Sequence, residues 1–191
     1  MAWRRRRRST MGRKLYVIRH GQTEWNVQNR VCGRADVELT EEGRQQARDA
    51  AGQLVGKDIK RVIVSPLKRT QQTARLLLDG AGMDLPMELD ARIMEHDFGA
   101  NDGIDRRDPD FLICRRHVPL RQPGGESVFQ VVHRVYSLID EVKASEDTGN
   151  VLFVCHGAVS RVIRSYFVDM TNEEFFSYLA GNCELVEYEL D

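Results

Sequence analysis

Short apolar runs that alternate with segments of helical spacing constrain the fold of this 191-residue chain most strongly. Three of the runs are KLYVIR at residues 14–19, RVIVS at residues 61–65 and NVLFVC at residues 150–155. Near-continuous apolar runs of this length are typical of strands that are buried on both faces of a parallel sheet. The alternation therefore predicts an α/β fold, a three-layer α/β/α sandwich with a mainly parallel central sheet.

The segments between these strands carry helix signals. Helices are predicted over residues 39–55, 65–80, 126–144 and 159–168. Thr40 is the expected N-cap of the first, and Ser65 caps the second, with Pro66 at its first helical position. A short strand is expected near residues 89–93. The alternating run ELVEYEL at residues 184–190 predicts a strand at or near the sheet edge.

The segment from residue 96 to residue 123 is the least regular part of the chain. It contains the breakers DG, DP, VP and QP, which favour turns over continuous elements. We expect it to form a loop or short helices over one end of the sheet.

The first ten residues, MAWRRRRRST, hold five consecutive arginines with no apolar segment behind them that resembles a signal peptide. We expect residues 1–10 to be a disordered basic extension and residues 11–191 to form a single domain. Without the five arginines the formal net charge changes from −1 to −6, because 23 basic residues then face 29 acidic ones. An acidic folded part argues against a nucleic-acid partner, although the arginine run leaves that hypothesis open.

No apolar run approaches the roughly 20 residues that cross a bilayer, so no membrane attachment is expected. The four cysteines contain no CxxC pair, which argues against a zinc or thioredoxin-type site. Reduced thiols in a cytoplasmic protein are the expected state.

Polar side chains that can take part in catalysis follow several of the predicted strands. The first strand ends in Arg19 and His20, Arg69 follows the second by one helical turn, and His156 follows the strand NVLFVC. Because ligands bind beyond the carboxyl ends of the strands in open α/β sheets, these four side chains should converge. Glu95, in RIMEHDFG, precedes the covering segment.

This set suits phosphoryl transfer to nitrogen. A neutral imidazole on His20 attacks phosphorus and becomes phosphohistidine, which divides one difficult displacement into two easier ones. Arg19, Arg69 and His156 supply donors to the phosphoryl oxygens. Glycines beside both histidines, Gly157 among them, allow close backbone approach, and Glu95 acts as general acid and base.

A metal centre is the rival interpretation, with His96, His117 and His133 as further ligand candidates. The sequence has no HxH or HExxH, and no carboxylate pair lies at ligand spacing near His20 or His156. Two arginines would also repel a divalent cation. We therefore expect neither a metal nor another cofactor.

Taken in order, these motifs resemble the histidine phosphatase superfamily, which contains cofactor-dependent phosphoglycerate mutase and many small phosphatases. The matching stretches are RHGQTEWN, GRADVELTEEGRQQA, SPLKRTQQTA, MEHDFG, PGGES and VLFVCHG. The resemblance implies that His20 is the phosphorylated nucleophile and Glu95 the general acid and base. It places Arg19, Arg69 and His156 in the phosphate pocket, adds donors from Asn26, Gln22 and Thr23, and brings the backbone near Cys32 and Gly33 to the entrance. Two departures are Asp102, where the family often has glutamate, and Cys155, where serine is common.

The same resemblance leaves phosphatase and mutase open. A mutase of this family carries a long insertion between the glutamate motif and the second histidine, whereas only 61 positions separate Glu95 from His156 here. The short covering segment favours a phosphatase acting on a small phosphorylated metabolite. Arg115 and Arg116 resemble the arginine pair with which mutases hold a substrate carboxylate. A non-catalytic phosphoprotein-binding module is the third alternative, although it would be expected to lack His20 or Glu95.

Substrate specificity is expected to lie mainly in the irregular segment. The candidates for contact with the leaving group are Phe98, Phe111, Arg115, Arg116 and His117, and Cys32 and Gly33 complete the expected substrate-binding set. An exposed edge strand would permit an oligomer without giving evidence for one.

Overall fold

The computed structural model describes residues 12–147 and 149–190. The described residues form a five-stranded sheet with the order β3-β2-β4-β1-β5. β1 (Lys14–Arg19), β2 (Ile59–Val64), β3 (Met87–Leu89) and β4 (Asn150–Cys155) are parallel. β5 (Leu185–Glu189) runs antiparallel to β1 at one edge. The predicted mainly parallel sheet and its alternating edge strand are thus confirmed, while the predicted basic extension lies outside the described residues.

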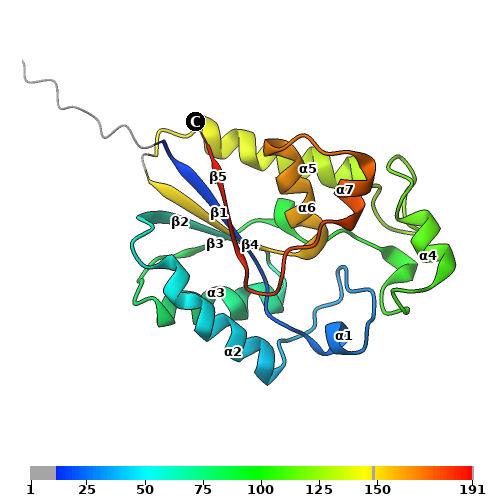
Figure 1. Cartoon of the computed structure of the whole chain (residues 1–191), viewed down its shortest axis with the longest axis horizontal. Coiled ribbons are helices and arrows are strands. Elements are labelled where there is room, and N and C mark those ends of the chain that lie inside the picture. Colours follow the sequence, from blue (N-terminus) through cyan, green and yellow to red (C-terminus); the bar gives the residue numbers. More distant parts are fainter. Residues whose placement is uncertain (1–11, 148, 191) are drawn as a thin grey trace, which may run out of the picture.

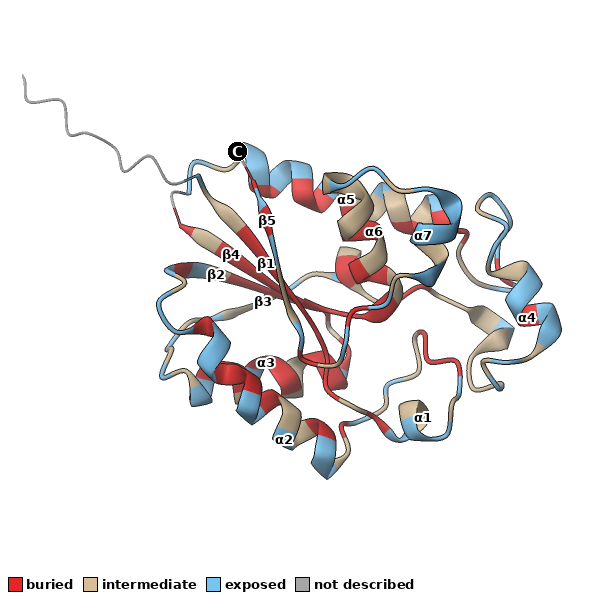
Figure 2. Ribbon diagram, viewed as in Figure 1, coloured by how far each residue is buried: buried red, intermediate tan, exposed pale blue. Residues whose placement is uncertain are grey.

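Helices cover both faces of this sheet, which confirms the three-layer architecture (Figure 1). α2 (Glu41–Ala50) and α3 (Lys68–Gly80) lie on one face, and α5 (Val128–Ala144) and α6 (Gly157–Phe167) lie on the other. Alternate residues of a strand point to opposite faces. Accordingly, Leu15 and Val17 pack in the core under α5 and α6, whereas Tyr16 and Ile18 pack under α2 and α3. Buried residues follow the strands and the inner helix faces (Figure 2).

The helix boundaries agree with the sequence in part. Thr40 caps α2 as predicted, because its side chain accepts a hydrogen bond from the backbone N–H of Gly43. The helix continues only as a 3₁₀ turn over Ala51–Leu54. The predicted cap at Ser65 is wrong, since α3 begins at Lys68 after Leu67 in an extended conformation.

Short elements cover the carboxyl ends of the strands. They are α1 (Glu24–Val27), two 3₁₀ turns (Ala91–Ile93 and Gly99–Asn101), α4 (Pro109–Cys114) and α7 (Asn172–Ser177). The strand expected near residues 89–93 is partly wrong, because β3 ends at Leu89 and a 3₁₀ turn follows. The irregular segment does form short helices over one end of the sheet, as predicted. No helix among the described residues is long and apolar enough to cross a bilayer.

Candidate active site

His20 follows β1 directly and is almost fully buried, with 4% of its surface exposed. Its Nδ1 lies 2.7 Å from the carbonyl oxygen of Gly21, and this oxygen only accepts hydrogen bonds, so Nδ1 carries the proton. Burial, followed by the charges of Arg69 and Arg19, holds the pKa of His20 well below its ordinary value. The ring is therefore neutral, and its free lone pair is on Nε2.

Arg69 joins the two histidines of the site. Its Nε lies 3.2 Å from Nε2 of His20 and 3.2 Å from Nδ1 of His156, so it donates toward both rings. Its terminal nitrogens donate to the carbonyl oxygens of Gly33 and Ala35, each at 2.8 Å. The guanidinium is completely buried in the first turn of α3 and is held in one orientation from both sides.

His156 follows β4 directly and is the N-cap residue of α6. Its Nε2 lies 2.7 Å from Oγ of Ser65, and the ring centroids of His156 and His20 are 5.2 Å apart. Burial, followed by the charges of Arg69 and His20, holds the pKa of His156 well below its usual range. Ser65 was predicted as a helix cap, and the structure makes it the hydrogen-bond partner of a histidine 91 residues away.

Arg19 reaches the cavity from the end of β1. One terminal nitrogen donates to the carbonyl oxygen of Ala180 at 2.8 Å. Its Nε is buried without a hydrogen-bond partner among the described residues, which is unusual for a charged group. A Cβ on Gly157 would meet the end of the exposed Leu179 side chain at 2.8 Å, which would have to shift, and this Nε at 3.6 Å, an ordinary contact. Gly21 instead packs against the backbone of Gly43, away from the cavity.

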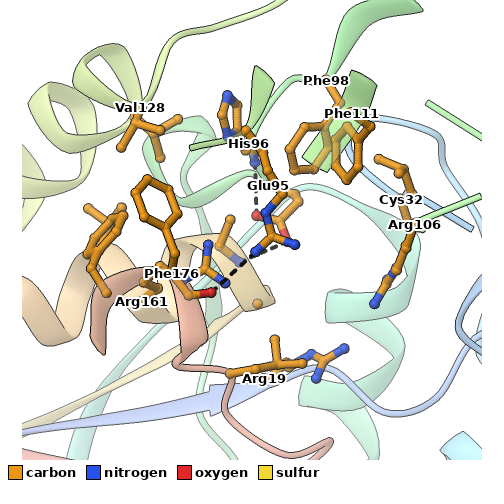
Figure 3. A pocket seen from close by; sticks show the side chains of 18 of the residues that line it. Arg19, Cys32, Glu95, His96, Phe98, Arg106, Phe111, Val128, Arg161 and Phe176 are labelled. Atoms are coloured by element: carbon orange, nitrogen blue, oxygen red, sulfur yellow. Dashed lines mark hydrogen bonds between the residues drawn. The ribbon is translucent and has the colours of Figure 1, made fainter. Parts of the chain in front are cut away.

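Glu95 faces the cavity from irregular backbone after β3 (Figure 3). One carboxylate oxygen accepts from the N–H of His96 at 2.9 Å, and the other accepts from Ala158 at 3.2 Å, in the first turn of α6. Only 6% of the residue is exposed. Two backbone donors therefore fix the carboxyl group on the histidine side of the cavity.

The remaining predicted phosphate donors divide into two groups. Asn26 lines the cavity, and its side-chain oxygen accepts from the N–H of Thr23, which leaves the NH₂ group for a ligand. The structure does not bring Gln22 and Thr23 to the cavity. The Gln22 side chain accepts from Thr40, and Thr23 caps α1.

Aromatic and basic side chains form the outer wall of the cavity (Figure 3). Cys32, Phe98, Phe111 and Arg115 line it, as predicted candidates for substrate contact. Arg116 and His117 do not, because both side chains are exposed on the turn after α4. Gly33 acts indirectly, through the carbonyl oxygen that holds Arg69.

Several lining residues were missed in the sequence. They lie in the loop after the 3₁₀ turn Gly99–Asn101, in α6, in α7 and in the loop after α7. In this order they are Arg106, Arg161, Phe175 with Phe176, and Leu179. No motif marks them, and the spacing of α6 is that of an ordinary amphipathic helix. Within the described ranges, no group of three or more His, Cys, Asp and Glu side chains is arranged to hold a metal ion.

Comparison with known proteins places the chain in a family. The model of the histidine phosphatase superfamily (branch 1) matches residues 15–191, so the chain belongs to that superfamily. A 2,3-bisphosphoglycerate-dependent phosphoglycerate mutase of Mesorhizobium japonicum is 33% identical, over 95% of this chain and 94% of that protein. An acid phosphatase of Mycobacterium tuberculosis is 36% identical, over 82% of this chain and 76% of that protein.

A solved structure supports the same assignment. The mycobacterial glucosyl-3-phosphoglycerate phosphatase superposes with a TM-score of 0.81 at 28% identity, covering 93% of this chain and 90% of that one. The relatives thus include both mutases and phosphatases. The chain therefore belongs to a family of enzymes that contains both types.

Proposed function

We propose that this protein is a phosphomonoester hydrolase that acts through a phosphohistidine on Nε2 of His20. The observation that carries the proposal is the state of this ring. The Gly21 carbonyl holds the proton on Nδ1, and burial keeps the ring neutral, so a lone pair on Nε2 faces Arg69 at the cavity. An unprotonated nitrogen in this setting is the nucleophile that phosphoryl transfer requires.

In the first step, Nε2 forms a bond to phosphorus while the bond between phosphorus and the leaving oxygen breaks. The unpartnered Nε of Arg19 and the free NH₂ of Asn26, which line the cavity, donate to the phosphoryl oxygens. The completely buried guanidinium of Arg69, in contact with Nε2 of His20, adds positive charge beside them. Glu95, in its protonated form, gives its proton to the leaving alcohol.

In the second step, water attacks the phosphorus of the phosphohistidine. Glu95 takes one proton from this water, and the N–P bond breaks to release inorganic phosphate and the neutral ring of His20. Atoms and protons balance over the two steps, and neither step needs a metal ion.

His156 contributes through a change of tautomer. In the structure without phosphate its Nδ1 faces the donor Arg69, so its proton is on Nε2 and is donated to Ser65. When a phosphoryl oxygen lies beside Nδ1, that nitrogen becomes the donor, and the Ser65 hydroxyl donates to Nε2 in return. A hydroxyl supports both states because it donates and accepts.

The outer wall favours a substrate with a second anionic group. Arg106, Arg115 and Arg161 line the cavity, and in the part of the chain that the structure describes none of them has a carboxylate within 4.0 Å. Burial and then the charge of Arg115 lower the pKa of Arg161 to about 10, which reflects uncompensated positive charge. A phosphorylated metabolite with a carboxylate or second phosphate would compensate it, beside the rings of Phe98 and Phe111.

Mutase activity is the second candidate, supported by Arg115 in the cavity wall and by the mutases among the relatives. Hydrolysis is favoured because the covering segment is short and holds only a 3₁₀ turn and the six-residue helix α4. Such a cover leaves water access to a phosphohistidine. The four free cysteines agree with a reducing compartment, which supports the cytoplasm as the proposed location.

The test is a panel of phosphomonoesters, assayed for inorganic phosphate and for isomerisation of 3-phosphoglycerate with 2,3-bisphosphoglycerate present. Release of phosphate with negligible isomerisation is expected, together with an acid-labile phosphoryl group on His20. Rapid isomerisation with little phosphate release would make the protein a mutase. Turnover that persists in a folded His20→Ala variant would refute the assigned nucleophile.

A further inference from the structure

Glu95, the proposed acid, lies on a segment without helix or strand structure. The chain leaves β3 at Leu89, makes one 3₁₀ turn and continues in irregular backbone through residues 94–98. Proton transfer loses efficiency when a carboxyl group moves by about 1 Å. Contacts from outside the segment must therefore hold its backbone in place.

Arg134 of α5 supplies contacts on one side of this segment. Its NH1 donates to the carbonyl oxygens of Arg92 at 2.6 Å and Met94 at 2.7 Å, and its NH2 donates to that of Glu95 at 3.1 Å. Three carbonyl groups over four consecutive residues are thus bound by one planar guanidinium. Its side chain is only 14% exposed.

Glu126, from the PGGES motif, holds both Arg134 and the far side of the segment. Its two carboxylate oxygens each lie 2.9 Å from Arg134, at Nε and NH2, in a bidentate pair. One of these oxygens also accepts from the N–H of Asp97 at 3.0 Å, and the Glu126 carbonyl lies 2.8 Å from Nε2 of His96. The residues before and after Glu95 are therefore bound to one partly buried ion pair.

We infer that Arg134, oriented by Glu126, is a positioning residue that holds the Glu95 carboxyl group in place for proton transfer to the leaving oxygen. This inference deepens the proposed function and rests on it. Arg134 bonds the backbone of the Glu95 segment and is not among the residues that line the cavity, so it acts through Glu95 and not on the phosphate. Lysine cannot replace it, because an ammonium group lacks the planar fork that reaches three carbonyls and a carboxylate.

A positioning role for the general acid has a specific kinetic signature. An ester with an alkyl leaving group, such as glycerol phosphate, needs the proton in the transition state. p-Nitrophenyl phosphate does not, because nitrophenolate leaves without protonation. General acid catalysis contributes about 10²–10⁴-fold, so partial loss of position should cost tenfold or more on the alkyl ester alone.

The experiment measures kcat/KM of the full chain on both esters for wild type, Glu95→Gln, Arg134→Gln and Arg134→Lys. We expect both Arg134 variants to lose at least about tenfold on glycerol phosphate and less than about threefold on p-nitrophenyl phosphate. Glu95→Gln should show the same pattern more strongly. The inhibition constant of inorganic phosphate should stay within about twofold of wild type, because the phosphate pocket does not use Arg134.

The matched control is Arg61→Gln. Arg61 also forms a bidentate ion pair, with the exposed Glu88 at 2.9 and 3.0 Å, but on β2 and β3 and without a hydrogen bond to the Glu95 segment. The Arg61→Gln substitution should leave kcat/KM unchanged on both esters. Equal losses on both esters, or no loss on glycerol phosphate, in the Arg134 variants would overturn the inference. If Arg134→Gln does not fold, Arg134→Lys, which retains the charge beside Glu126, decides by the same criterion.

Failure of the proposed function gives a different result. Wild type would then release phosphate from neither ester, or Glu95→Gln would show no dependence on the leaving group. A wild type with the expected pattern in Glu95→Gln but not in the Arg134 variants would refute only the positioning role.

Discussion

Lowering the pH from 6.5 to 5.5 is expected to reduce the free energy of unfolding by about 2 kcal/mol through His20 and His156 alone. Both rings are buried between arginines, and burial is the main cause that holds the pKa of each well below 6.5. In the unfolded chain, each ring has its ordinary pKa and takes up a proton over this range. The unfolded state therefore binds more protons, so stability rises with pH and falls as the solution is acidified.

The magnitude follows from the proton uptake of the unfolded chain. An imidazole with a pKa near 6.5 goes from half protonated to about nine-tenths protonated between pH 6.5 and pH 5.5. If the folded ring stays neutral, the difference in bound protons between the unfolded and folded states, integrated over this pH range, lowers the free energy of unfolding by about 1 kcal/mol for each histidine. The pKa of His96 is also lowered, chiefly by burial, so it adds to the loss in the same direction.

Urea unfolding at the two pH values measures this loss in wild type and in a His20→Gln/His156→Gln double variant. Carboxylates and His96 contribute equally to both proteins, so the difference between the two pH dependences isolates the two rings. The double variant should lose about 2 kcal/mol less than wild type, and each single variant about 1 kcal/mol less. Identical losses in wild type and double variant would show that the folded rings are not neutral.

Three further changes have defined outcomes. Asp102→Ala removes the carboxylate that accepts from the N–H groups of residues 33–35. Because the carbonyl oxygens of Gly33 and Ala35 in this stretch hold Arg69, inorganic phosphate should inhibit about tenfold more weakly in steady-state assays. Phe153→Ala opens a cavity in the core under α5 and α6 and should cost about 3–5 kcal/mol in urea unfolding, against under 0.5 kcal/mol for the exposed Phe129→Ala. Activity should survive excess EDTA, and loss that a divalent ion restores would contradict the two-step mechanism.

The architecture and the centre of the site were predictable because both depend on strong local signals. The apolar runs identify the strands, and the parallel sheet brings their carboxyl ends to one edge. Arg19, His20 and His156 therefore meet, although the two histidines are 136 positions apart in the sequence. The chemical types at these ends, two imidazoles with arginines, already restrict the reaction to one on an anion.

The outer wall was not predictable, because it depends on how distant loops pack. Arg116 and His117 have the right chemistry within the irregular segment, but the turn after α4 leaves them exposed. Arg161 belongs to a helix whose pattern gives no functional signal, and only the packing of α7 and the loop after it encloses its side chain. Single-sequence patterns carry no information about such contacts.

Ser65 shows how a tertiary contact overrides a local signal. Serine before proline is a common helix start, and the prediction used that preference. The backbone of Leu67 is extended at φ −71° and ψ 140°, so the helix begins later and the Ser65 hydroxyl is free to bind His156. Leu67 itself provides no side-chain cap, and the N–H of Lys68 donates instead to the Asp36 side chain at 2.7 Å. The Ser65 hydroxyl accepts only a long bond of 3.5 Å from the N–H of Leu67, while its short contact of 2.7 Å orients a ring of the site.

The charge of the site leads to a last prediction, which concerns anions. The two neutral rings lie beside Arg19 and Arg69, and a bound dianion would favour protonation of His156 next to it. Sulfate stays a dianion between pH 6.5 and pH 5.5, so its binding should stabilise the protein more at pH 5.5 than at pH 6.5. Urea unfolding with and without sulfate measures both gains, and the His20→Gln/His156→Gln double variant corrects for the general salt effect. Equal gains at the two pH values in wild type would mean that the anion does not share its site with a titrating ring.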